Sequence, residues 1–290
     1  MRARGSFLSI SAILAVASPC ARADGPYVSV SESVTWQDNM TNAPAGDGIR
    51  SAFGVESGAT MTWLHSVDFS TRLTSGVAID ASACPSYGGL DSLSVGPAVE
   101  LRHKLGLGAL APVLYAGLSG CATGYLDPER SNLEGDLVFG LSKRLREDVQ
   151  VVLDGRLGSY DAKDIVFSGN FASLGTTLNW DVNDTWRIKL TAGWRSGDTV
   201  ANYAAVQSSY GWVSPDPITM YLPGAWHYVG TFHEPYVAWR ESARTWSYGA
   251  GISPALGRHT SVAFQFVHFE SDSYGRYTDN VASVSLVHHF

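Results

Sequence analysis

The sequence predicts an all-β chain that closes into a transmembrane antiparallel β-barrel, with about 12 strands in an up-and-down meander. Three observations predict this fold. Apolar and polar side chains alternate in segment after segment, short and long connections alternate between these segments, and the chain begins with the pattern of an export signal. The composition agrees, because only 16% of the residues are charged while the chain holds 30 glycines, 9 tryptophans and 13 tyrosines.

The clearest alternating segment begins at Trp186. Its apolar face holds Ile188, Leu190, Ala192 and Trp194, and its polar face holds Arg187, Lys189, Thr191, Gly193 and Arg195. Successive side chains of a strand point to opposite faces, whereas a helix would scatter these charges around its axis. Six further segments sort their side chains in the same way, with apolar faces that begin at Phe53, Phe69, Leu93, Leu133, Val149 and Leu174. This repetition indicates strands that separate an apolar face from a polar one.

The connections between these segments alternate in length. Short turns are expected at residues 66–68, 104–108, 146–148, 182–184 and 254–258. Longer connections, rich in Gly, Pro and Asp, are expected at residues 38–48, 83–89, 124–131, 161–164, 200–228 and 272–275. Five short and six long connections imply twelve strands, and the even number places both termini on the inner side of the membrane.

A soluble β-sandwich would also show alternation, but other features favour a barrel. Trp63, Trp180 and Trp186 stand at strand ends beside short turns, as an aromatic girdle at a membrane surface requires. The polar face carries charges of both signs, which a sandwich core would not tolerate. A closed barrel also leaves no unpaired strand edge in lipid.

The N-terminus has the three parts of a secretory signal peptide. Two arginines supply a positive start, residues 7–16 form a short apolar run, and residues 21–23 have the small-x-small pattern Ala-Arg-Ala. The run is too short to cross a bilayer as a helix. We therefore expect residues 1–23 to be a cleaved signal peptide and residues 24–290 to form the barrel as one domain.

The last predicted strand, residues 278–290, ends on Phe290. Apolar residues precede it at alternate positions, namely Leu286, Val284 and Ala282. This pattern resembles the C-terminal strand of Gram-negative outer-membrane proteins, which the barrel-assembly machinery recognises. His288 departs from the pattern, because an aromatic residue such as Tyr is usual there. The resemblance implies a small porin-like barrel in outer-membrane lipid, with Phe290 as its assembly signal, and it identifies no subfamily.

The charged side chains of the polar face are the candidate lining of a lumen. They include Arg72, Arg102, Glu134, Asp136, Asp154, Arg156, Arg187, Lys189 and Arg195. Twelve strands ~4.8 Å apart and tilted by ~40° enclose a cylinder on the order of 24 Å across, which inward side chains narrow to about 10–12 Å. A small solute fits into such a lumen, and a folded protein does not.

These features predict a narrow passive pore for small polar or anionic solutes. Arg187, Lys189 and Arg195 share one strand, and a basic wall would favour anions weakly, since carboxylates of the same face cancel part of its charge. The alternative is a closed structural or surface-interaction barrel, whose lumen is plugged by cross-strand ion pairs. The formal net charge of −7 argues against nucleic acid as a partner.

Two cysteines remain after the signal peptide, Cys84 and Cys121. An exported chain meets an oxidising compartment, where a disulfide is permitted. Both residues lie where we expect outer loops or strand ends. The sequence therefore predicts a disulfide between them, with two unpaired buried thiols as the alternative.

The remaining candidate features lie near the outer end. The connection 200–228 is rich in Tyr, Trp and Pro, and it either folds inward as a constriction or forms an external cap. His233 and Glu234, with Ser242 nearby, raise the third alternative of a membrane-embedded lipid-modifying enzyme. No G-x-S-x-G or H-E-x-x-H spacing supports catalysis, so we assign no catalytic residues, no metal site and no cofactor.

Overall fold

The computed structural model describes residues 26–44, 48–204, 206–208, 211–213, 226–229, 231–232, 236–273 and 275–290. The predicted signal peptide lies outside these residues, so its cleavage stays a prediction. Within the described ranges, no helix is long and apolar enough to cross a bilayer.

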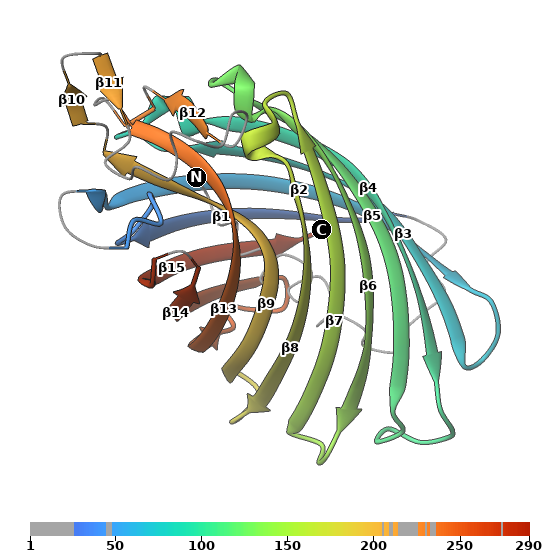
Figure 1. Ribbon diagram of the computed structural model, residues 1–290. Helices are drawn as coiled ribbons and strands as arrows, with labels where there is room; N and C mark the ends of the chain where they lie inside the picture. Colours follow the sequence, from blue (N-terminus) through green and yellow to red (C-terminus); the bar gives the residue numbers. More distant parts are fainter. Residues whose placement is uncertain are drawn as a thin grey trace.

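Twelve antiparallel strands form the wall of a closed barrel, as Figure 1 shows. They are β1 (Tyr27–Gln37), β2 (Ala52–Ser66), β3 (Thr71–Ala83), β4 (Ser92–Lys104), β5 (Val113–Tyr125), β6 (Asn132–Arg144), β7 (Val149–Ala162), β8 (Gly169–Asp181), β9 (Trp186–Ala204), β13 (Tyr236–Pro254), β14 (Thr260–Asp272) and β15 (Tyr277–His289). Each strand pairs with the next one along the wall, and pairing of β1 with β15 closes the ring. The predicted meander of twelve strands is confirmed.

Short elements lie in the long connections at one end of the barrel. They are the strands β10 (Val206–Ser208), β11 (Gly211–Val213) and β12 (Trp226–Val229), and the 3₁₀ turns η2 (Gly88–Leu90), η3 (Pro128–Arg130) and η4 (Ile165–Phe167). Strands β9 and β13 are the longest in the wall and pair over 19 positions, so their ends reach beyond the neighbouring strands at this end.

The outer surface of the wall is apolar. Leu133 and Leu137 of β6 and Leu153 and Leu157 of β7 are all exposed, although each would be buried in a soluble domain. The intervening side chains of these strands point into the lumen, so each strand presents one apolar and one polar face. An apolar band around a polar interior is the arrangement that a barrel in lipid requires.

The start of β1 and the C-terminus lie at the end of the barrel that carries the short connections. The Phe290 amide donates to the Val28 carbonyl near the start of β1, and the start of β1 pairs with the part of β2 that precedes its short turn. Trp180 and Trp186 flank the connection 182–185, each with 43% of its surface exposed. Their position matches the predicted aromatic girdle.

The first long connection folds inward at the opposite end. Residues 39–43 are at most 4% exposed. The Asn42 side chain donates to the Val200 carbonyl of β9 over 3.0 Å, and the Asn202 amide donates to the Thr41 carbonyl over 2.8 Å. Asn42 adopts a φ of 55°, a left-handed conformation that Asn tolerates better than most residues.

Apolar side chains from several long connections meet over this end of the barrel and form what we call the cap. Its buried core consists of Met40, Ala52, Cys84, Tyr87, Leu90, Val166, Phe167, Val200, Phe232, Tyr236 and Ala238. The Phe232 ring lies 5.1 Å from the rings of both Tyr87 and Tyr236. Because these residues come from different sides of the ring of strands, their contacts place the cap across the outer mouth.

The predicted disulfide between Cys84 and Cys121 is wrong, since both residues are present as thiols. Cys84 follows β3 and is buried in the cap, whereas Cys121 lies in β5, and β4 separates these strands. The register through β4 offsets the two cysteines by six positions along the strands. This offset amounts to ~20 Å at ~3.3 Å per residue, far more than a disulfide can bridge.

Candidate functional site

A cavity of about 820 Å³ occupies the lumen. Its wall is formed by residues of β4 to β9 and β13 to β15. Leu90, Arg130 and Phe167 line it beneath the cap, while Asn183 and His259 line it beside the short connections. The cavity therefore extends along the barrel from the cap to the end that carries the short connections.

The strand alternation places most of the predicted lining residues on this cavity. Seven of the nine line it, namely Arg102, Glu134, Asp154, Arg156, Arg187, Lys189 and Arg195. Asp136 binds Arg156 behind the cavity surface. Arg72 is exposed near the start of β3, beside a short connection and outside the cavity.

Arg156 of β7 is held by two carboxylates of the adjacent strand β6. Its Nε donates to Asp136 Oδ1 over 2.8 Å and its Nη2 donates to Glu134 Oε1 over 2.9 Å, with a further short bond from Nη2 to Asp136 Oδ2. All three side chains are largely buried. These charge-assisted hydrogen bonds hold the Arg156 guanidinium in one position, and the two carboxylates compensate its charge.

Phe171 of β8 lies between two guanidinium groups. Its ring centroid is 5.3 Å from Cζ of Arg156 and 4.6 Å from Cζ of Arg195, both within cation–π distance. Arg195 also donates to the Asp198 carbonyl over 2.9 Å, and so does the Tyr160 hydroxyl over 3.0 Å. These contacts position Arg195 without a carboxylate partner among the described residues.

Gly197 allows β8 and β9 to pack closely beside Arg195. It has a φ of 149°, and a Cβ at this position would lie 2.3 Å from the Asn170 carbonyl oxygen. Only glycine allows β9 to approach β8 so closely beside Arg195 and Asp198.

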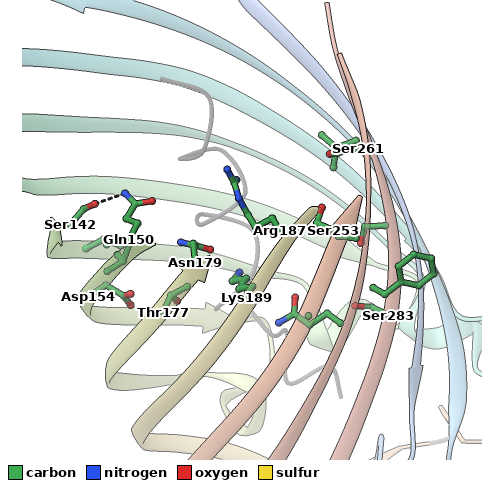
Figure 2. Close-up of a pocket in the computed structure, with 18 of the residues that line it drawn as sticks. Ser142, Gln150, Asp154, Thr177, Asn179, Arg187, Lys189, Ser253, Ser261 and Ser283 are labelled. Atoms are coloured by element: carbon green, nitrogen blue, oxygen red, sulfur yellow. Dashed lines mark hydrogen bonds between the residues drawn. The ribbon is translucent and has the colours of Figure 1, made fainter. Parts of the chain in front are cut away.

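The lower part of the cavity holds Asp154, Arg187 and Lys189. Arg187 forms an ion pair with Asp181 over 2.5 Å at the end of the lumen. Figure 2 shows Asp154 of β7 and Lys189 of β9 on either side of β8, with Thr177 and Asn179 between them. Within the described ranges Lys189 forms no salt bridge, and the Asp154 carboxylate acts on its charge through space.

The cavity carries more positive than negative side chains. Its eight cationic side chains are Arg102, Arg130, Arg144, Arg156, Arg187, Lys189, Arg195 and Arg258. Its five carboxylates are Glu134, Asp154, Asp181, Asp184 and Asp198. Glu100, Asp127 and Asp136 bind Arg102, Arg130 and Arg156 from behind, so eight carboxylates stand against eight cations once these partners are included. The cationic excess is therefore confined to the surface of the cavity, in a chain with a net charge of −7.

Sequence reasoning missed several lining residues. Phe171 and Tyr160 are aromatic, but in the alternation of their strands both fall on the polar face, which lines the cavity. Their position in the alternation could have identified them. Arg130 lies in a long connection, where no alternation indicates which way a side chain points. It nevertheless lines the upper end of the cavity.

The candidate enzyme residues do not form a site in the described part of the chain. His233 and Glu234 lie outside the described residues. Ser242 of β13 is exposed. No group of three His, Cys, Asp or Glu side chains within the described ranges is arranged to hold a metal ion. Most of the connection 200–228 also lies outside the part whose side chains are described, so its predicted role as a constriction stays untested.

Solved structures share this fold. An outer-membrane channel from Pseudomonas putida F1 is similar with a TM-score of 0.55 and 14% identity, over 93% of this chain and 97% of the channel. The KdgM porin, solved with oligogalacturonate, has a TM-score of 0.44 and 9% identity, over 90% of this chain and 99% of the porin. The TodX monoaromatic hydrocarbon channel has a TM-score of 0.43 and 8% identity, over 92% and 90% of the two chains.

No protein-family model and no curated protein matches the sequence. At these identities the similarity concerns the fold and does not extend to the solute. The apolar band and the twelve-stranded closure define a transmembrane β-barrel, a fold that the Pseudomonas putida channel shares.

Proposed function

We propose that the protein is a narrow passive pore in the outer membrane that favours small anionic solutes. The observation that carries this proposal is the cavity along the lumen from the cap to the short connections, whose surface holds eight cationic side chains and five carboxylates. A volume of about 820 Å³ suits a small organic molecule with its hydration water.

Of the three cations of β9, Lys189 and Arg195 would contribute most to an anion preference. Arg156 and Arg187 have carboxylate partners, so much of their charge is compensated. A positive charge without such a partner, held in a narrow channel with low-dielectric walls, raises the local concentration of anions. The predicted basic strand β9 therefore acts chiefly through two of its three cations.

The cap makes conduction conditional. Because apolar side chains from several connections cover the outer mouth, a solute passes only when the cap moves or when a passage opens beside it. A closed structural barrel is the second candidate, supported by the same cap and by the Arg156 ion pairs within the lumen. The two candidates differ in whether any solute crosses the membrane through the lumen.

Solute entry into proteoliposomes distinguishes these candidates. We expect vesicles that contain the folded barrel to swell in iso-osmotic glycerol and sodium acetate, but not in the tetrasaccharide stachyose, which is too large for the lumen. Vesicles without protein provide the baseline. If the wild-type barrel and a variant with a shortened cap both fail to admit glycerol and acetate, the protein is a closed barrel.

A further inference from the structure

Arg130 has an unusual environment at the upper end of the lumen. It is the last residue of η3, in the connection between β5 and β6, and only 3% of its surface is exposed. Its Nε donates to Asp127 Oδ2 over 3.1 Å, and its Cζ lies 4.3 Å from the centroid of the Phe167 ring. One edge of the guanidinium is therefore bound to a carboxylate and one face is covered by an aromatic ring.

At the other end of the guanidinium, one nitrogen lacks a hydrogen-bond partner. Arg130 Nη2 is buried and has no hydrogen-bond partner, yet Arg130 is one of the residues that line the lumen cavity. Burial lowers the pKa of Arg130, and the adjacent Asp127 raises it. An arginine stays protonated in proteins, so this group presents a positive charge and a free donor. An unsatisfied buried donor on a charged group is costly unless another partner completes it.

The surroundings hold this guanidinium in place. The Lys163 amide donates to the Ser131 carbonyl over 3.0 Å, and the Asp164 amide donates to the Glu129 carbonyl over 3.1 Å. These two bonds tie the connection that carries Arg130 to the one that carries Phe167. The Asp127 amide also donates to the Gly89 carbonyl over 3.1 Å. A donor fixed in this way loses little conformational entropy when it binds a ligand.

We propose that Arg130 forms a binding site for the oxyanion group of a small solute, just beneath the cap. The oxyanion accepts a hydrogen bond from Nη2, while Nε stays bound to Asp127 and the Phe167 ring covers one face of the guanidinium. Tyr125 and Asn132 also line the cavity, and the Asn132 side chain donates to the Arg130 carbonyl over 3.1 Å. The inference rests on the proposed pore only in treating the bound molecule as a transported solute.

A carboxylate and a phosphate share this chemistry, and a binding experiment separates them. The folded barrel in uncharged detergent micelles is titrated by calorimetry with sodium benzoate or with inorganic phosphate, at constant ionic strength set with sodium chloride. Benzyl alcohol serves as the uncharged analogue. We expect saturable binding of at least one of the two anions and none of the alcohol, and the tighter anion identifies the source.

Two variants test the role of Arg130. Arg130→Met keeps an apolar stem against Phe167 but removes every donor, so the affinity for the anion should fall by about tenfold or more. Arg130→Lys keeps the charge without the planar fork and should also bind more weakly. Arg276→Met removes an exposed cation at the same end of the barrel, outside the cavity, and should bind like the wild type.

The outcomes are distinct from those of the pore experiments, because binding in micelles does not require conduction. Loss of anion binding in both Arg130 variants, with retention in Arg276→Met, supports the site. The proposal is overturned if the wild type shows no saturable anion binding, or if a folded Arg130 variant binds as tightly as the wild type. Wild-type titrations decide the first outcome even if neither variant folds.

Discussion

The guanidinium of Arg156 donates hydrogen bonds from both Nε and Nη2 to the carboxylate of Asp136, from β7 to the adjacent strand β6. Glu134 binds the same arginine over 2.9 Å. Glu134 and Asp136, which were expected to offset the basic strand β9, are therefore engaged with β7, whereas Asp154 still acts on Lys189. Among the three cations of β9, Lys189 and Arg195 are the ones without a salt bridge in the described part of the chain.

The Arg156 cluster should contribute to stability. Asp136→Asn leaves a largely buried guanidinium with a weaker partner, so we expect the free energy of unfolding to fall by about 2–3 kcal/mol. Urea unfolding in lipid vesicles, followed by tryptophan fluorescence, measures this change. Asp148→Asn is the control, because the Arg146–Asp148 pair is well exposed and should contribute less than about 0.5 kcal/mol. Equal losses in the two variants would contradict this account of the cluster.

The two cysteines should behave differently. Cys84 is fully buried in the cap, whereas Cys121 is partly exposed and its thiol lies 3.6 Å from the hydroxyl of the cavity residue Thr123. A small anionic methanethiosulfonate should therefore modify Cys121 in the folded barrel and spare Cys84, as peptide mass spectrometry would show. Both thiols should react after denaturation without reductant. A disulfide-linked peptide, or labelling of Cys84 alone, would show that this assignment is wrong.

The cap should limit conduction. Replacing residues 39–43 by a short Gly-Ser linker removes Met40 from the cap core and the Asn42 bond to Val200. We expect the single-channel conductance to rise several-fold, since the outer mouth loses a segment that covers it. A matched linker at residues 107–110, in an exposed connection at the opposite end, should leave the conductance unchanged. Equal conductance in both variants and the wild type would mean that the cap does not restrict the passage.

The stability that the turn between β2 and β3 contributes should depend on pH through the ionisation of Asp68. Hydrogen bonds from Ser70 and Thr71 lower the pKa of this carboxyl from 3.8 to about 2. A depressed pKa in the folded state means that its stabilisation is present above pH 3.8 and disappears as the pH falls through about 2. Asp68→Ala should therefore be less stable than the wild type at neutral pH, and the difference should vanish near pH 2 in urea unfolding. A difference that persists unchanged at that pH would refute the role of the ionised carboxyl.

The alternation of side chains was sufficient to predict the strands and the lumen face. In β9 its polar face coincides with side chains that line the cavity, because a two-residue period leaves no choice of face once lipid is outside. It could not predict that Glu134 and Asp136 would bind Arg156, since diagonal partners depend on the register between strands. The same uncertainty made Cys84 and Cys121 appear to be neighbours.

The cap and the position of Arg130 at the lumen could not be predicted from the alternation of side chains. Met40, Leu90, Val166 and Phe232 are apolar residues in four separate connections, and only the folded chain brings them together. Arg130 follows a proline and a glutamate in a 3₁₀ turn, where sequence spacing does not show which side faces the lumen. Sites built from loops require the three-dimensional arrangement of several connections.

The proposed function requires that the lumen conducts and favours anions. Reversal potentials in planar bilayers, measured across a potassium chloride gradient, test it most directly. We expect the wild type to show a weak anion preference, Lys189→Gln with Arg195→Gln to lose most of it, and the further change Arg187→Gln to add little because Asp181 already compensates that residue. Lys163→Gln, which removes an exposed cation outside the cavity, should behave like the wild type. A silent bilayer even after removal of the cap segment, or a clear preference for cations, would contradict the account.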